Sequence, residues 1–152
     1  MLEEVSPVKV TVSVAGLAET KAAMQSLTKA TGRRQMRDAL LAAGEITAKA
    51  ARALAPVDEG WLREGINVST MLTRTQAAMH VKRSEVEVFI GPKGSSKSIV
   101  QEFGSVDQPP QSYMRPAWDM THRAVLDRVA DEVMVRVDAA IARAAKKAAR
   151  AG

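Results

Sequence analysis

The sequence contains no cysteine, and this absence excludes several kinds of chemistry at once. Disulfide frameworks, thiolate nucleophiles and cysteine-based zinc sites all need a residue type that the chain does not have. Histidine is nearly as scarce, because only His80 and His122 are present and neither has the H-x-x-x-H partner of a metal-binding helix face. We therefore expect no metal centre and no other cofactor.

Long apolar runs are also missing. No segment approaches the ~18 uncharged apolar residues that a membrane-spanning helix needs. The first residues, Met-Leu-Glu-Glu, are acidic and start no apolar run, so they do not resemble a signal peptide. We expect a soluble protein that is made in the cytoplasm and has no membrane partner.

Aromatic residues make up only 3% of the 152 residues, and the hydrophobic share of 46% is rich in alanine. The length suits a single domain over residues 1–152. Alanine buries little area per residue, so the core of this domain is expected to be thin. Such a chain can gain stability by packing against copies of itself or against other subunits, and we expect a homo-oligomer.

The first half of the chain predicts one strand and two helices. Residues 7–14 alternate between valine and polar residues, as a half-buried strand does. A short helix is predicted over residues 17–31 and is expected to end at Gly32. An amphipathic helix of about six turns follows over residues 33–55, and Gly44 inside it indicates that a neighbouring element approaches closely. Pro56 is expected to stop this helix.

The second half predicts several antiparallel strands and a long final helix, which makes the domain α+β. Asp58 is placed to cap a short turn over residues 59–63. Extended segments are predicted at 66–73, 76–82 and 85–90, followed by a flexible loop at 91–98. One or two helical turns then run to Phe103, with Gly104 as the cap. The last helix starts at Pro116, and its predicted inward face consists of Trp118, His122, Val125 or Leu126, Val129, Val133, Val137 and Ile141.

A search for catalytic motifs along the chain yields no active site. Gly91 to Ser98 resembles a phosphate-binding P-loop, but Ser96 stands where the second glycine is required. No G-x-S-x-G nucleophile elbow occurs. On the last helix, acidic and basic residues alternate at helical spacing, which predicts a solvated, ion-paired face made of Asp127, Asp131, Glu132, Arg123, Arg128 and Arg136. We predict that the protein is not an enzyme.

The net charge of +5 comes mostly from the last ten residues, 143–152. Two interpretations of this basic tail stay open. Its cations can end a solvated or frayed helix, where they complement the helix dipole, or they can contact DNA phosphates or an acidic partner. The second interpretation gives the alternative function, a DNA-binding module that uses the C-terminal helix. The cations concerned are Arg143, Lys146, Lys147 and Arg150.

Two segments near the start of the last helix gather scarce aromatic residues and opposed charges: 102–105, with the sequence Glu-Phe-Gly-Ser, and 113–119. Phe103 is expected to anchor the short helical turn on the sheet, and Gly104 to let the chain reverse. Met114 is placed as a hydrophobic staple. Glu102 and Arg115 form a two-pronged ion pair, within or between subunits, or remain two separate surface charges worth at most ~1 kcal/mol.

Three segments together resemble a known family. Residues 55–66 are similar to the "A-P-x-D-T-G-x-L-R-x-S-I" signature of the neck or tail-completion proteins of long-tailed, lambdoid-type bacteriophages. Residues 102–105 and 114–119 are similar to that family's "E-F-G-T" and "[FY]-[LM]-R-P-A-[FL]-[DE]". The chain departs from these patterns at Glu59, Gly65 and Ser105, and it has residues 98–100 where the family carries an aromatic residue.

This resemblance implies a structural virion protein at the head-to-tail junction and no enzyme activity. It implies a ring of identical subunits, for example a hexamer, around the DNA channel, with other neck and tail proteins as partners and the virion as the location. The residues that the three segments share form the predicted interface or ordering loop, namely Pro56, Asp58, Gly60, Leu62, Glu102, Phe103, Gly104, Met114, Arg115, Pro116 and Trp118.

Overall fold

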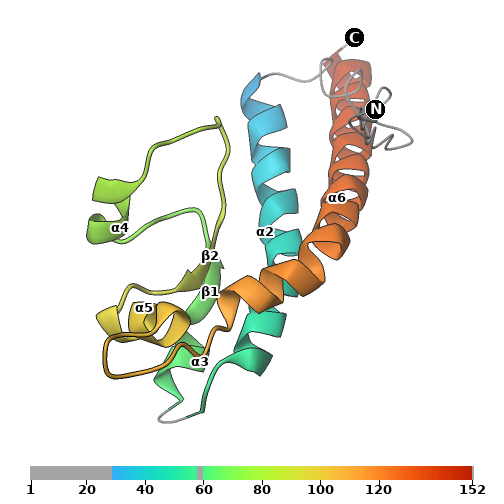
Figure 1. The fold of residues 1–152 in the computed structure, drawn as a ribbon. Coiled ribbons are helices and arrows are strands. Elements are labelled where there is room, and N and C mark those ends of the chain that lie inside the picture. The colour runs from blue at the N-terminus through green and yellow to red at the C-terminus, as the bar shows by residue number, and fades with distance from the viewer. Residues whose placement is uncertain (1–28, 58–59, 152) are drawn as a thin grey trace, which may run out of the picture.

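The computed structural model describes residues 29–57 and 60–151, and it packs two long helices beside a small sheet (Figure 1). The predicted α+β class is confirmed. The strand expected at 7–14, most of the helix expected at 17–31 and Asp58 lie outside the described residues. In chain order the elements are α2 (Lys29–Leu54), α3 (Trp61–Gly65), β1 (Ile66–Ser69), α4 (Arg74–Met79), β2 (Phe89–Pro92), α5 (Ser96–Phe103) and α6 (Met114–Ala151).

Helices α2 and α6 run antiparallel and provide most of the core (Figure 1). The buried face of α2 is built from small residues, among them Ala39, Ala43 and Ala48, all fully buried. Small side chains let two helices approach closely, and the hydroxyls of Thr47 and Thr121 form a 2.8 Å hydrogen bond between them. The core is rich in alanine, as the composition predicted.

The start of α2 differs from the prediction. Gly32 does not end a helix: it is buried inside α2, which is continuous from Lys29. A glycine inside a helix costs only about 1 kcal/mol relative to alanine, so packing outweighs it. The predicted helix end is confirmed, because α2 ends at Leu54, two residues before Pro56. The close approach at Gly44 is also confirmed, since a β-carbon there would lie 2.8 Å from Cγ1 of Val68 in β1.

The sheet has two antiparallel strands, with Ile66 opposite Pro92 and Ser69 opposite Phe89. The middle strand predicted at 76–82 is wrong, because residues 74–79 form helix α4. Thr73 and Gln76 cap this helix reciprocally, each side chain bonding the other residue's backbone N–H, and this capping box stabilises the helix start. The strand predicted at 85–90 pairs only from Phe89 onward.

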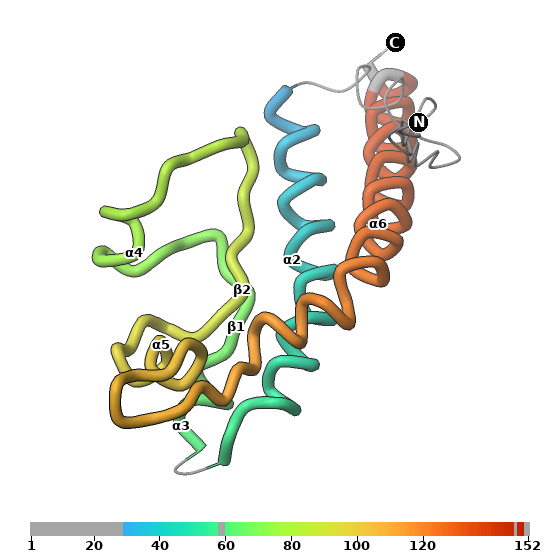
Figure 2. Tube along the Cα trace, viewed as in Figure 1, coloured from blue at the N-terminus to red at the C-terminus, as the bar shows by residue number. Residues whose placement is uncertain are grey.

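Residues 70–88, which we call the arm, project from the sheet beside α2 and include α4 (Figure 2). None of the arm residues is buried. Its turn is fastened by Glu87, whose carboxylate bonds the His80 ring at 2.8 Å and the backbone N–H of Arg83 at 2.7 Å. Glu85 joins the arm to the start of α2 through Lys29, at 3.1 Å. The arm is thus an ordered projection held by polar contacts.

The predicted inward face of α6 is correct in its middle and wrong at both ends, since Ile141 at the C-terminal side is 37% exposed. Val133 and Val137 are buried, whereas Trp118 is 49% exposed and His122 is exposed. Ala117 faces the core instead, where it is fully buried in one cluster with Ala48 and Ala51 of α2. None of the helices in the described part of the chain is both long and apolar enough to cross a membrane.

Candidate functional site

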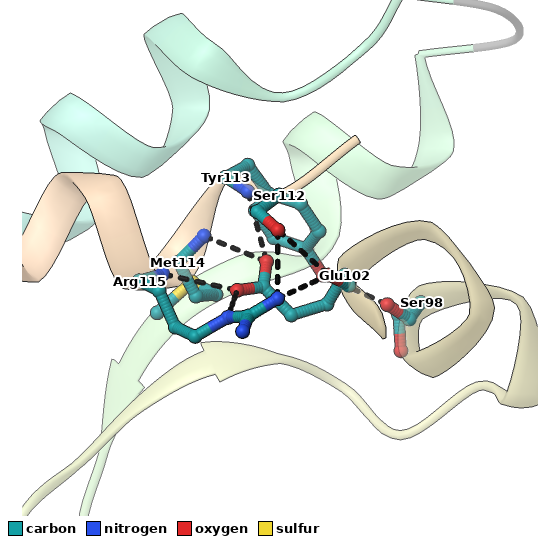
Figure 3. Close-up of polar contacts among 6 residues, drawn as sticks. All are labelled: Ser98, Glu102, Ser112, Tyr113, Met114 and Arg115. Carbon is teal, nitrogen blue, oxygen red and sulfur yellow. Dashed lines mark hydrogen bonds and ion pairs between the residues drawn. The ribbon is translucent and has the colours of Figure 1, made fainter. Parts of the chain in front are cut away.

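The candidate site is the carboxylate of Glu102, which closes the N-terminal end of α6 (Figure 3). Its oxygens accept hydrogen bonds from the backbone N–H groups of Tyr113 at 2.8 Å, Met114 at 2.9 Å and Arg115 at 3.1 Å. The first N–H groups of a helix have no partner inside the helix, and the helix dipole favours a negative charge there. A glutamate on α5, eleven residues before Tyr113, therefore acts as the cap of α6.

Arg115 binds the same carboxylate a second time through its side chain. Its Nε lies 3.0 Å from Glu102 Oε1, and its Nη2 donates to the Glu102 backbone carbonyl at 2.8 Å and to Ser112 Oγ at 2.8 Å. The Ser112 hydroxyl donates in turn to that carbonyl. Of the two alternatives left open by the sequence, the ion pair is present within one chain, but it is not two-pronged, because only Nε reaches the carboxylate while Nη2 donates to the backbone carbonyl.

The return loop, residues 104–113, brings these groups together. Gly104 ends α5 with φ 78°, a left-handed conformation that favours glycine, and a β-carbon there would lie 2.9 Å from Gln108 O. The chain then turns back, so that Gln111 N donates to Gln101 O at 2.9 Å. Gly104 and the following turn thus set the geometry by which Glu102 reaches α6.

Burial shapes the acidity of the site. The Glu102 side chain is only 6% exposed, which by itself would raise its pKa. The backbone N–H groups of Met114, Tyr113 and Arg115 and the Arg115 guanidinium outweigh this burial, so the pKa of Glu102 lies below the ordinary value. Burial and the negative charge of Glu102 raise the pKa of Tyr113 to about 12. The buried Tyr113 hydroxyl donates to Ser98 O at 3.4 Å.

Four apolar side chains from α5, the return loop and the start of α6 are exposed, and we call them the apolar rim. Ile99 is 61% exposed, Phe103 62%, Trp118 49%, and Val106 in the return loop is fully exposed. The expectation that Phe103 anchors on the sheet is wrong. Ser98 and Glu102, four residues apart, occupy the buried side of α5, so Phe103 points away from the core. The Arg115 guanidinium lies over the Phe103 ring, with its central carbon 4.7 Å from the ring centroid.

The remaining predicted site residues lie either around α3 and the end of α2 or in the basic tail at the end of α6. Leu62 is 5% exposed and packs in one core cluster with Tyr113 and Ala117. Gly60, with φ 77°, precedes α3, and Pro56 follows α2. The basic tail residues Arg143, Lys146, Lys147 and Arg150 are exposed, and α6 continues through all of them to Ala151.

The predicted ion-paired face of α6 is only partly present. Glu132 bonds both Arg128 and Arg136. Asp127 and Asp131 are exposed and form no ion pair with any described residue. The prediction is therefore wrong for these two, because Glu132 reaches both neighbouring arginines and the shorter aspartates do not.

The contacts of Glu102 and Arg115 have a structural role, because they hold the return loop against the start of α6. Both Glu102 oxygens are occupied by donors, so the carboxylate has no position from which to accept a substrate proton. His122 lies about two turns into α6, and its Nδ1 contacts the backbone oxygens of Trp118 and Asp119. Among residues 29–57 and 60–151, no group of three or more His, Asp or Glu side chains is placed to hold a metal ion.

Comparison with known proteins yields one match. The model of the HK97-gp10-like family, described as "Bacteriophage HK97-gp10, putative tail-component", matches residues 18–104, more than half of the chain. The search of curated proteins and the search of solved structures found no match. The matched range includes Glu102 and Gly104 and ends before α6 begins. The chain therefore belongs to the HK97-gp10-like family of bacteriophage tail components.

Proposed function

We propose that the protein is a structural virion protein of the phage head-to-tail junction, where it completes the neck or tail as a ring of identical subunits around the DNA channel and catalyses no reaction. The observation that carries this proposal is the exposed apolar rim beside the hydrogen-bonded return loop, in a chain of a tail-component family. The virion is then its location, and other neck and tail proteins are its partners.

The rim suits a protein contact better than a solvated surface. Phe103, Val106 and Trp118 stand exposed beside a backbone that Glu102 and Arg115 hold in place. Aromatic and apolar side chains concentrate in the cores of protein interfaces. A surface that is already ordered loses little conformational freedom on binding, so more of its contact energy appears as affinity. We infer that the return loop docks against another tail protein.

The junction role is tested in the phage that encodes the chain. Inactivating the gene should leave DNA-filled heads and separate tails, which electron microscopy counts directly. Complementation with Val106→Asp should fail to join them, whereas Ala53→Asp, an exposed substitution on α2, should restore joined particles. Normal particles without the gene, or equal complementation by both variants, would contradict the proposal.

The ring is tested with the purified protein. Analytical ultracentrifugation across a concentration series should show a closed oligomer of one defined size, because a ring of identical subunits closes at a fixed number. A hexamer is the expected size. A compact monomer at every concentration, with neck partners absent or present, would rule the ring out.

One observation favours the alternative, a contact with DNA. Arg143, Lys146, Lys147 and Arg150 are spaced to share one face of α6, which stays helical through them. Duplex binding that weakens steeply with salt, and that is lost on removing residues after Ile141, would support a tail contact with channel DNA. Equal binding by the shortened chain would exclude it.

A further inference from the structure

The outer face of α6 carries an acidic stripe. Met120, Asp127, Asp131 and Asp138 follow at spacings of seven, four and seven residues, which places them on one side of a helix. All four are exposed, and the three aspartates form no ion pair with any residue in the described part of the chain. Val135, beside the stripe, is 67% exposed. The stripe thus combines unpaired negative charge with exposed apolar surface.

The arm offers the complementary properties. Met71, Met79 and Val81 are 75–79% exposed. Arg74, Lys82 and Arg83 are exposed, and their side chains make no ion pair with a described residue. The two acids of the arm are already engaged, Glu85 with Lys29 and Glu87 with His80. The free charge of the arm is therefore positive.

The two surfaces cannot meet within one molecule. Figures 1 and 2 show α2 between the arm and the C-terminal half of α6. Val133 and Val137 of α6 pack against Ala39 of α2, and helical spacing places the stripe on a different side of α6, facing away from α2. Two different complementary surfaces on one subunit generate a head-to-tail contact between copies, and such a contact closes into a ring if the rotation allows it. This arrangement identifies the occupant as a second copy of this chain.

We propose that the arm of one copy docks on the acidic stripe of α6 in the next copy, with arm cations facing Asp127, Asp131 and Asp138 and with Met79 and Val81 packing beside Met120 and Val135. The inference rests on the proposed ring and specifies its contact. Electrostatic matching of this kind sets the register of an interface and excludes wrong partners. The hydrogen bonds of Glu87 and the ion pair between Glu85 and Lys29 keep the arm ordered before it binds.

Engineered cysteines test the contact directly, because the natural chain has none. Val81→Cys protein mixed with Val135→Cys protein should form a disulfide-linked pair under mild oxidation, seen as a dimer on a non-reducing gel. Val106→Cys replaces Val81→Cys in the matched control, since Val106 is also exposed but lies in the return loop. Equal crosslinking of both mixtures would overturn the proposal.

A charge swap gives a second test that does not depend on crosslinking. Changing Arg74, Lys82 and Arg83 to glutamate should weaken self-association at least about tenfold at low salt, with the helical circular dichroism unchanged. Changing Asp127, Asp131 and Asp138 to lysine in the same chain should restore association. A variant that associates as the wild type does, or a swap that fails to restore association, would sink the proposal.

The outcomes separate the two proposals. If the wild-type protein forms a ring but the Val81→Cys and Val135→Cys mixture crosslinks no better than the control mixture, the ring is retained and the arm contact is ruled out. If the wild-type protein stays monomeric, both alone and with its neck partners, the ring and the arm contact are both ruled out.

Discussion

Glu102 and Arg115 are joined twice, since the backbone N–H of Arg115 and its Nε both donate to Oε1 of the Glu102 carboxylate, at 3.1 and 3.0 Å. One contact caps a helix and the other closes an ion pair. The same two residues therefore set where α6 starts and hold the return loop against α5. Because the return loop carries part of the apolar rim, the contacts that stabilise the fold also fix the shape of the rim.

Removing the carboxylate should be costly. In Glu102→Ala, the N–H groups of Tyr113 and Met114 lose their acceptor in a site that is nearly closed to water, and Arg115 loses its counter-charge. Each buried N–H group left without an acceptor costs about 1–3 kcal/mol, whereas the Arg115 side chain is 56% exposed and adds little, so we expect a loss of about 3 kcal/mol in the free energy of unfolding. Urea denaturation measures this loss. Glu64→Ala, at an exposed glutamate, should change stability by less than about 0.5 kcal/mol; a similar loss in both variants would refute the capping role.

Acid should weaken the fold through the same group. Because the pKa of Glu102 is lower in the folded chain than its ordinary value of 4.5, the folded state binds this proton less readily than the unfolded state. The stabilisation is therefore complete above pH 4.5 and is lost as the pH falls through the lowered pKa. Unfolding free energies measured from pH 6 down to pH 3 should fall more steeply for the wild type than for Glu102→Gln. Parallel curves would show that the carboxylate contributes no pH-dependent stability.

Glu87 calls for a control in that experiment. Hydrogen bonds from the Arg83 backbone and the His80 ring lower its pKa to about 2. Its contribution has the same sign, so it is also lost in acid. Repeating the titration in a Glu87→Gln background removes this contribution, and the difference between wild type and Glu102→Gln should persist there.

The sequence anticipates the charged pair but not the backbone contacts around it. Glu102 and Arg115 are unusual opposed charges next to scarce aromatic residues, so a pair can be inferred from composition. The bonds to the backbone of residues 113–115 depend on how Gly104 turns the return loop, and no residue type indicates that path. The wrong prediction for Phe103 has the same cause, because the direction of its side chain depends on which face of α5 the contacts of Glu102 bury.

The helices are predicted better than the sheet, for a physical reason. A repeat of small and apolar residues identifies α2, and proline marks its end near Pro56. The alternating residues at 76–82 suggest a strand, yet a helix forms there. Its capping box, Thr73 and Gln76, is a signal that the sequence contains and that the prediction missed. On α6, alanine at 117 packs inward against the alanines of α2 although tryptophan at 118 is far more hydrophobic, so hydrophobicity alone does not identify the buried face.

Gly44 should not tolerate a methyl group. In Gly44→Ala, the new β-carbon would lie 2.8 Å from Val68 Cγ1 and 3.4 Å from Ile90 Cδ1, so the sheet must shift away from α2. We expect a loss of roughly 1–2 kcal/mol in unfolding free energy despite the better helix propensity of alanine. Gly32→Ala is the matched control, because no described atom lies within 4 Å of a β-carbon there, and it should stabilise the protein by up to about 1 kcal/mol. Adding Val68→Ala should recover part of the Gly44→Ala loss; no recovery would locate the conflict elsewhere.

Phe103 should separate assembly from stability. Its ring is 62% exposed and touches the fold mainly through the Arg115 guanidinium, a contact worth about 0.5–1 kcal/mol at an exposed site. Phe103→Ala should therefore cost less than about 1 kcal/mol in urea denaturation, far below the cost expected for Glu102→Ala. In the phage complementation assay, however, it should reduce the number of joined particles, because the rim loses an exposed aromatic side chain beside the return loop. A stability loss of about 3 kcal/mol would restore Phe103 as a core anchor, and full complementation would remove the rim from the docking surface.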